Sequence, residues 1–237
     1  SSSTLEISTD NLDLRFVDES TSLGNLGDNK SWAISWADVD DDGFTDVFLA
    51  NHDQQPILLR NIGGTSFSDI APLSSDISRS DKHSCAWTDF DLDGDQDLYC
   101  ATGALSGTGS EPANFYRNEG NGTFSDIAAQ TGTENGPGRG RTVNWADFDL
   151  DGDLDLFIAN WRTSDANVRS LLFDNSGGVF LDVTEQRGLD TPGAGLRQSL
   201  VFDYERDGDP DLLVHYDGYD PTRHLCDCIA IMRNDGQ

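Results

Sequence analysis

The hydrophobic pattern of the chain repeats a unit of short strands. A segment of interleaved small and large residues, such as SWAISWAD or GRTVNWAD, leads into an Asp-rich turn and then into an apolar run such as VFLAN or LFIAN. A third short run ends at an Asn- and Gly-containing turn, and a fourth contains Phe-x-Asp. Asn and Gly suit hairpin turns because they adopt positive φ at little cost. The unit is therefore four antiparallel strands, and no helical periodicity of useful length accompanies it.

This unit occurs four times. The gapless alignment WADVDDDGFTDVFLAN, WTDFDLDGDQDLYCAT, WADFDLDGDLDLFIAN and VFDYERDGDPDLLVHY starts at Trp36, Trp87, Trp145 and Val201. Four-stranded units at this period are typical of β-propeller blades. We therefore expect an all-β fold, a β-propeller of four-stranded antiparallel blades, in which residues 14–237 form one domain after an N-terminal arm, residues 1–13. The expected blades are about 31–70, 83–127, 141–183 and 197–233.

The two ends of the chain bear on blade closure. The last unit stops after its third strand at IAIMRNDGQ, whereas LRFVDESTSLG near the N-terminus has Phe16 and Asp18 in the pattern of a fourth strand. We expect residues 14–20 to complete the last blade and to close a four-bladed ring. Two alternatives remain: the chain is a slice of a longer propeller, or this strand completes the blade of a neighbouring molecule and builds a filament.

The composition is dominated by short carboxylates. The chain has 15 Lys and Arg residues and 43 Asp and Glu residues, which gives a formal charge of −28. Of the acidic residues, 36 are Asp. This charge argues against a nucleic-acid partner, because phosphate binding needs a basic surface. No apolar run approaches the roughly 18–20 residues of a membrane-spanning helix.

Twenty of the acids lie in the four turns, within the pattern D-x-[DE]-x-D-G-x-x-D. Carboxylates at positions one, three, five and nine, with a carbonyl at position seven and a Gly at position six for the turn, provide the oxygen-rich shell that Ca²⁺ prefers. No His or Cys lies in these turns, which disfavours zinc and copper. The predicted ligands are Asp38, Asp40, Asp42, Phe44 and Asp46; Asp89, Asp91, Asp93, Asp95 and Asp97; Asp147, Asp149, Asp151, Asp153 and Asp155; and Asp203, Glu205, Asp207, Asp209 and Asp211. We expect three or four calcium ions, and the fourth turn is the weakest candidate because it carries Glu205 and Pro210.

These motifs resemble the FG-GAP/VCBS repeats over about residues 14–237. Proteins with such repeats include integrin-type ectodomains, cartilage-acidic-protein relatives and many secreted microbial proteins. The resemblance implies a propeller with structural calcium in the turns between the first and second strands of each blade, and extracellular interaction roles. Propellers of this family commonly have seven blades, whereas this chain supplies four.

The cysteines and sequons fit an extracellular protein. Cys85 and Cys100 flank the second turn almost opposite each other, which predicts a cross-strand disulfide, with two buried free thiols as the alternative. Cys226 and Cys228 are expected in a small-ring or intermolecular disulfide, although a metal site with His224 is conceivable. Two N-glycosylation sequons begin at Asn29 and Asn121.

Partner-binding residues are sought in the long connections on the face opposite the calcium turns, because binding generally resides in variable loops on a rigid scaffold. The candidates are Trp161, Arg162, Tyr216 and Tyr219, and the alternative is that they cover blade edges. No catalytic motif is present, so the sequence does not favour an enzyme. We expect a secreted or cell-surface, non-catalytic module for a glycan or protein ligand. The alternatives are a subunit of a filament or surface layer assembled by strand exchange, and an accessory domain of a polysaccharide-active enzyme.

Overall fold

The computed structural model describes residues 16–24, 31–51, 54–70, 81–103, 112–136, 138–161, 168–189, 195–217 and 229–236. Within these ranges the chain is built from β-strands and two short helical turns, η1 and α1. No helix of this described part is long and apolar enough to cross a membrane.

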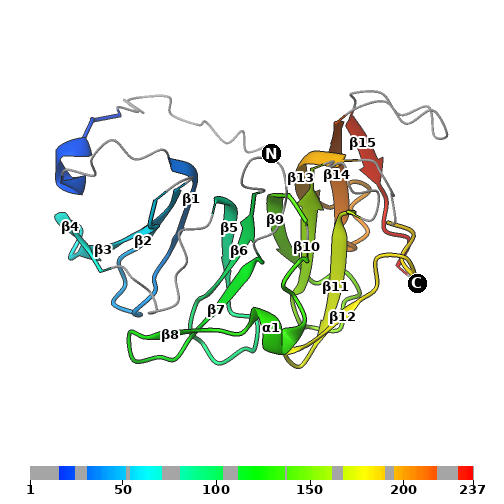
Figure 1. Cartoon of the computed structure of the whole chain (residues 1–237), viewed down its shortest axis with the longest axis horizontal. Helices are drawn as coiled ribbons and strands as arrows, with labels where there is room; N and C mark the ends of the chain where they lie inside the picture. Colours follow the sequence, from blue (N-terminus) through cyan, green and yellow to red (C-terminus); the bar gives the residue numbers. More distant parts are fainter. Residues whose placement is uncertain are drawn as a thin grey trace, which may run out of the picture.

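The strands form four antiparallel sheets, each from consecutive strands, as Figure 1 shows. The first blade contains β1 (Ser31–Ala37), β2 (Asp46–Asn51), β3 (Ile57–Ile62) and β4 (Ser66–Asp69), and the second contains β5 (Lys82–Thr88), β6 (Asp97–Thr102), β7 (Asn114–Asn118) and β8 (Phe124–Asp126). The third contains β9 (Gly140–Ala146), β10 (Asp155–Asn160), β11 (Leu171–Ser176) and β12 (Val179–Asp182), and the fourth contains β13 (Gly195–Phe202), β14 (Asp211–Asp217) and β15 (Ile229–Met232). The predicted all-β, blade-like architecture is confirmed.

The blades follow one another in an arc, with the first strands β1, β5, β9 and β13 side by side. A separate hydrophobic cluster fills each of the three spaces between consecutive blades. Among the described residues no comparably extensive contact joins β1 to β13, so the arc is open.

The packing between blades follows from the alternation of small and large residues. Ala33 and Ala37 of β1 pack against the same cluster as Trp87 of β5, and Ala86 of β5 packs against the same cluster as Trp145 of β9. Successive residues of a strand point to opposite faces, so the small residues leave room on one face for the indole ring of the next blade. The interleaving seen in the sequence is therefore the means by which the blades interlock.

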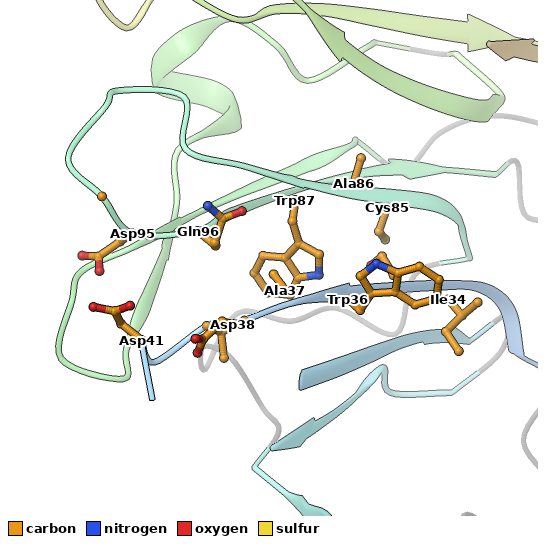
Figure 2. A pocket seen from close by; sticks show the side chains of 13 residues that line it. Ile34, Trp36, Ala37, Asp38, Asp41, Cys85, Ala86, Trp87, Asp95 and Gln96 are labelled. Carbon is orange, nitrogen blue, oxygen red and sulfur yellow. The ribbon is translucent and has the colours of Figure 1, made fainter. Parts of the chain in front are cut away.

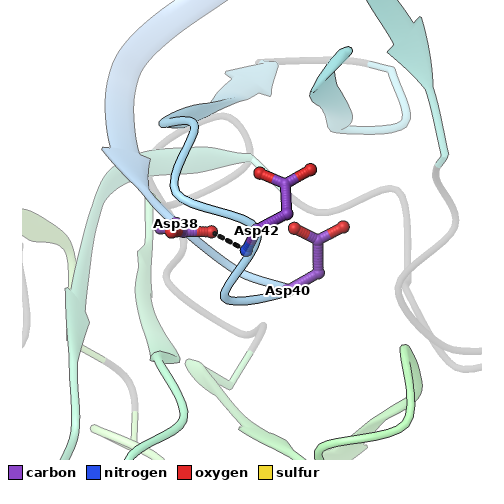
Figure 3. A group of neighbouring side chains, drawn as sticks. All are labelled: Asp38, Asp40 and Asp42. Atoms are coloured by element: carbon purple, nitrogen blue, oxygen red, sulfur yellow. Dashed lines mark hydrogen bonds between the residues drawn. The ribbon is translucent and has the colours of Figure 1, made fainter. Parts of the chain in front are cut away.

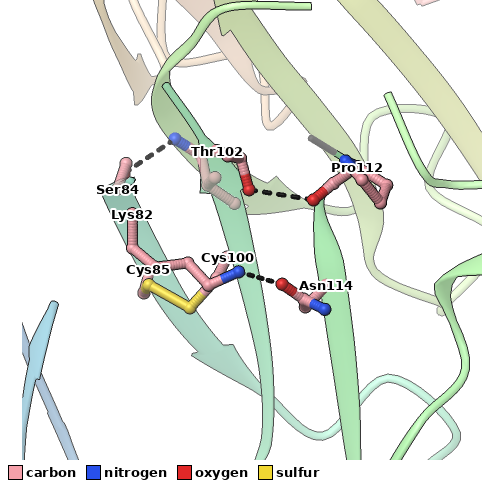
Figure 4. Close-up of a disulfide and its surroundings, with 8 residues drawn as sticks. Lys82, Ser84, Cys85, Cys100, Thr102, Pro112 and Asn114 are labelled. Atoms are coloured by element: carbon pink, nitrogen blue, oxygen red, sulfur yellow. Dashed lines mark hydrogen bonds between the residues drawn. A yellow bond between two sulfur atoms is a disulfide. The ribbon is translucent and has the colours of Figure 1, made fainter. Parts of the chain in front are cut away.

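The disulfide between Cys85 and Cys100 is confirmed, as Figure 4 shows. The two residues are direct cross-strand partners of β5 and β6, and both side chains are buried in the cluster between the first two blades. Cys226 and Cys228 lie outside the described residues, so their predicted bonding remains a prediction.

The predicted closing strand, residues 14–20, is wrong in its described part. Phe16–Glu19 belong to no strand, and Ser20–Leu23 form the 3-10 helix η1, which contacts β4 of the first blade. Figure 1 places η1 at the opposite end of the arc from β15. The fourth blade has three strands among the described residues, and residues 16–20 do not complete it. The filament hypothesis stays a prediction, and the structure gives it no support. The Phe-x-Asp pattern marks strands elsewhere. Here the Ser20 N–H donates a hydrogen bond to the Asp18 side chain (2.9 Å), and this bond starts a turn instead.

The two outer faces of the arc expose large apolar residues. Ile34 and Trp36 of β1 are 61% and 67% exposed, although they occupy the positions that Cys85 and Trp87 fill in the second blade. At the other end, Leu200 of β13 is 62% exposed. The position of Trp36 is thus at least partly buried within the arc and exposed at its edge.

This repetition provides a matched test of blade packing. Trp145→Ala removes a ring that contacts Tyr99, Phe115 and Phe180, and we expect it to cost about 3–5 kcal/mol of unfolding free energy. Trp36→Ala removes the equivalent but exposed ring, so its cost should stay within about 0.5 kcal/mol. Urea denaturation of both variants measures the difference, and equal destabilisation would contradict the packing described above.

Candidate metal centres

The four Asp-rich turns share one backbone conformation. The residue at position four has a left-handed φ of 54° to 65° in every turn, at Asp41, Leu92, Leu150 and Arg206. The Gly at position six has φ between 86° and 101°, at Gly43, Gly94, Gly152 and Gly208. A positive φ is unfavourable for Leu, so its recurrence indicates that the surrounding bonds determine the turn. The Gly could be predicted from the sequence, whereas the left-handed conformation of the residue two positions before it could not.

The first Asp of each turn holds the backbone in this shape. In the third turn, Asp147 Oδ1 accepts the N–H of Asp151 at 3.1 Å and Oδ2 accepts the N–H of Gly152 at 3.0 Å. Asp38 makes the same pair of bonds in the first turn, and Asp203 makes it in the fourth. Gly94 N–H donates to Asp89 in the second. The carboxylate at position one is therefore fixed before any cation arrives.

The ninth Asp is buried and braces the turn against the sheet. Asp155 is 2% exposed, and its two oxygens accept the N–H of Phe148 (2.9 Å) and the N–H of Asn175 on β11 (2.8 Å). The equivalent residues Asp46, Asp97 and Asp211 are equally buried and make the same two bonds. Burial raises the pKa of Asp97 to about 7 and that of Asp155 to about 6, although the N–H groups oppose the shift. Burial also raises the pKa of Asp46.

Carboxylates converge in three of the turns within the described residues. Each group offers one oxygen per residue, and these oxygens lie within 4.8 Å of one another: Asp38, Asp40 and Asp42; Asp89, Asp91 and Asp97; and Asp147, Asp149 and Asp155. Figure 3 shows the first group around the turn, with the Asp42 N–H bonded to Asp38. This hard-oxygen donor set fits Ca²⁺. The fourth turn keeps the backbone bonds but has no such convergence among its described side chains, and it is the turn with Glu205 and Pro210.

An arginine accompanies three of the turns. Arg60 of β3 pairs with Asp40 and lies 3.5 Å from Asp42, Arg187 lies 3.6 Å from Asp149, and Arg233 lies 3.5 Å from Glu205. Each guanidinium meets the acidic residue at position three of its turn. These cations offset part of the repulsion within each turn. A bound divalent ion would offset a further part.

The turns are also tied to the neighbouring blade. Asn118 of the second blade donates through Nδ2 to the Val39 carbonyl of the first turn (3.0 Å), and Asn175 of the third donates to Phe90 of the second turn (3.1 Å). Asn234 of the fourth donates to Phe148 of the third turn (2.7 Å). An ion that ordered one turn would therefore also order the hydrogen bond between that turn and the next blade.

A hollow of about 610 Å³ opens beside the first two turns. Figure 2 shows Trp36 and Trp87 on its wall, with Asp38, Asp41 and Asp95 at the end near the turns. The hollow combines exposed indole surface with carboxylates. The hollow was not predicted from the sequence, because partner-binding residues were expected on the opposite face.

The predicted partner-binding residues do not come together. Tyr216 was expected to be exposed but is 3% exposed, packed between the third and fourth blades with its hydroxyl 3.8 Å from Met232 Sδ. The expectation is wrong because Tyr216 lies on the inner face of β14, which continues past the short partner strand β15. Trp161 is half-buried beneath three arginines. Arg162, Tyr219 and Asn29 lie outside the described residues, whereas Asn121 is exposed in a turn, where its predicted glycosylation stays a prediction.

Comparison with known proteins supports the repeat assignment. A family model described as FG-GAP-like repeat matches residues 38–100, 89–158 and 147–214. Cartilage acidic protein 1 of Xenopus tropicalis is 31% identical over 111 residues, which are 46% of this chain and 16% of that protein. The Homo sapiens protein of the same name is 28% identical over 181 residues, 73% of this chain and 26% of its own length. The chain thus spans about a quarter or less of these two relatives.

Solved structures show a similar fold at low identity. The chain superposes on BBS1N, from a complex with ARL6DN, with a TM-score of 0.50 and 11% identity over 86% of this chain and 58% of that one. An Agrocybe aegerita lectin described as recognising non-reducing terminal N-acetylglucosamine gives a TM-score of 0.49 at 17% identity, covering 87% of this chain and 50% of the lectin.

Calcium should stabilise the protein through these turns. Each ion that binds only the folded state adds about 2.7 kcal/mol at a hundredfold excess over its dissociation constant, so EDTA should lower the melting temperature. Asp149→Ala removes an exposed carboxylate of the third turn and should lower the calcium stoichiometry by one. Glu185→Gln, an exposed acid outside the turns, is the matched control. An EDTA-insensitive melt of protein that carries no calcium by elemental analysis would contradict the site.

The calcium-free protein should become less stable as the pH rises. Burial raises the pKa of Asp97 to about 7 and that of Asp155 to about 6, so the folded state holds these protons more tightly than the unfolded state does. Their contribution to stability is therefore lost as the pH rises from about 4, the unfolded value, towards 7. In calcium-free buffer the melting temperature should fall between pH 5 and pH 8, and the gain on adding calcium should increase. A calcium-free melting temperature that rises over this interval would refute the assignment.

Proposed function

Because the chain belongs to the FG-GAP-like repeat family, we propose that it is a secreted, calcium-stabilised β-propeller module that binds a glycan or protein partner without catalysis. The observation that carries the proposal is the convergence of carboxylate oxygens in three successive turns, each of which is braced by a buried Asp at position nine. Calcium at millimolar extracellular concentration would saturate such turns. The turns support the calcium-stabilised part of the proposal, and the surface beside them supports the binding part.

The disulfide supports an extracellular setting. Cystines persist in oxidising compartments and are rare in the cytosol. Cys85 and Cys100 join adjacent strands of the second blade, next to the turn that begins at Asp89. The same blade is therefore reinforced by a covalent bond and by a candidate cation site.

The hollow at Trp36 and Trp87 supports a binding role. Trp36 is 67% exposed on a strand held by the first calcium turn, and exposed indole rings are common anchors at interfaces and on sugar faces. Asp41 and Asp95 at the same hollow supply acceptors for hydroxyl or amide groups. A rigid scaffold that presents an aromatic ring beside hydrogen-bond acceptors suits recognition without chemistry.

Binding arrays test the proposed function. The labelled chain, with calcium, should be retained on at least one feature of a glycan array or an extracellular-matrix protein array, and calcium removal should abolish retention. Trp36→Ala should weaken retention at the hollow while leaving the melting temperature unchanged. Leu181→Ala, an exposed apolar residue on β12, is the control. Failure on both arrays would overturn the binding role, and release of reducing ends from a polysaccharide would overturn the non-catalytic one.

A further inference from the structure

The hollow beside the first two turns lies between strands of neighbouring blades. Ile34 and Trp36 of β1 and Cys85 and Trp87 of β5 line it, and the two turns lie at one end, as Figure 2 shows. Its volume of about 610 Å³ lies within the range of about 300–1,000 Å³ that is usual for ligand pockets. The hollow is therefore large enough for a few side chains of a bound segment.

The wall of the hollow is held in place by packing within the protein. Trp87 meets Phe48 edge to face, with ring centroids 6.2 Å apart and planes 89° apart, and it also contacts Phe124. Cys85 is joined to Cys100 by the disulfide. A surface that is already formed has little conformational freedom left to lose on binding, so a ligand meets a lower entropic cost here than on a mobile loop.

The end of the hollow near the turns carries two carboxylates that the calcium pattern does not use. Asp41 occupies position four of the first turn, where the other turns have Leu92, Leu150 and Arg206. Asp95 occupies position seven of the second turn, and the calcium pattern takes the backbone carbonyl of that position rather than its side chain. Both side chains line the hollow. We call this pair the acidic end, and it would keep its negative charge when calcium occupies the turns.

Neither carboxylate of the acidic end has a cationic partner among the residues that the structure describes. Arg60 pairs with Asp40 and lies 3.5 Å from Asp42, but it forms no ion pair with Asp41, which stands between them in the sequence. The chain carries a formal charge of −28, so its more distant groups add to the negative potential. The acidic end therefore attracts a positively charged group more strongly than a neutral one.

The rest of the hollow offers apolar and aromatic surface. Trp36 is 67% exposed and Ile34 is 61% exposed. Lys and Arg side chains place their apolar stems along such surface while the charged head reaches a polar site. A neutral sugar could stack on Trp36, but it would leave the charge of the acidic end uncompensated, and an acidic saccharide would be repelled. Of these ligand classes, a basic peptide segment matches both parts of the hollow.

We propose that the hollow binds a basic segment of a partner protein, with an Arg guanidinium at the acidic end and the apolar part of the segment along Trp36. The planar fork of a guanidinium suits carboxylate oxygens, which favours Arg over Lys. Trp and Arg are also the residues that most often dominate the binding energy of protein interfaces. This inference rests on the proposed interaction function and commits it to a protein ligand and to one surface.

An NMR titration of the full chain with calcium tests the proposal through the indole N–H signals, and the Trp36 signal is identified by its loss in Trp36→Ala. The main probe is a capped peptide of sequence Leu-Arg-Leu-Arg-Leu. Its matched forms replace both Arg residues with citrulline, which has the same shape without the charge, or with Glu. Cellotetraose and a β-1,4-linked glucosamine tetramer represent neutral and cationic saccharides.

We expect the Arg peptide to shift the Trp36 signal and to bind at least tenfold more tightly than the citrulline form. Its affinity should fall as NaCl is raised, because the attraction to the acidic end is screened. The Glu form should not bind. Both saccharides should bind more weakly than the Arg peptide.

One variant separates the acidic end from the calcium turn. Asp41→Asn removes the charge and keeps a residue that adopts a left-handed conformation readily. We expect about a tenfold loss of affinity for the Arg peptide, with the calcium stoichiometry and the melting temperature unchanged. Glu185→Gln removes an exposed acid elsewhere and should leave the affinity unchanged.

Contrary results overturn the proposal in distinct ways. Equal binding of the citrulline form, or affinity unaffected by Asp41→Asn, would refute the role of the acidic end. Preferred binding of cellotetraose or of the glucosamine tetramer would replace the peptide with a sugar. A loss of bound calcium in Asp41→Asn would show that the hollow holds a metal ion instead.

Failure of this proposal can be told apart from failure of the proposed function. If no peptide binds but the arrays still show a calcium-dependent partner, the interaction module stands and only the basic-segment site fails. If the arrays are also blank and calcium has no effect on the melt, the proposed function fails as well.

Discussion

The buried aspartate at position nine is the constraint on which the rest of the structure depends. Its two oxygens join the N–H of position two in the turn to an N–H of the third strand, so a single carboxylate connects three segments of a blade. The same third-strand residue is an Asn whose side chain reaches the turn of the preceding blade. Turn, sheet and interblade joint are therefore one hydrogen-bonded unit, repeated along the arc. Burying a carboxylate without a cation is unfavourable, and burial accordingly raises the pKa of Asp97 and of Asp155.

In a protein built in this way, an ion bound at a turn would also act on the orientation of the blades. A cation held by the outer carboxylates lowers the electrostatic cost of the buried one, because an opposite charge favours the ionised form. The arginines that meet the acidic residues at position three offset part of this charge, but their side chains are partly exposed to solvent. The fourth turn has the same backbone bonds without convergent carboxylates among its described side chains, which indicates that hydrogen bonds alone are sufficient to shape the turn.

Much of this could be predicted from the sequence, because strands, turns and register follow from local periodicity. The pairing of Cys85 with Cys100 is an example, since the length of the turn fixes which residues face each other. The N-terminal segment could not be predicted, because the Phe-x-Asp pattern describes a strand only where a third strand is available beside it. The register shift in the first strand of each blade, such as the β-bulge between Ser31 and Ala33, could not be predicted for a similar reason. A bulge changes where one residue points, and no letter in the sequence marks the change.

The edges of the arc show why four blades do not simply close upon themselves. Within the arc, an indole of one blade packs into the same cluster as small residues on the first strand of the blade before it, as Trp87 does with Ala33 and Ala37. Trp36 presents the same ring at the open edge. The fourth blade, however, carries Leu200 and Phe202 where the first carries Ser35 and Ala37. Overfilling such a contact is destabilising, so the outer face of the fourth blade is a poor acceptor for Trp36. The surface around Trp36 is better matched to a strand with small residues, or to a ligand ring that lies flat against it.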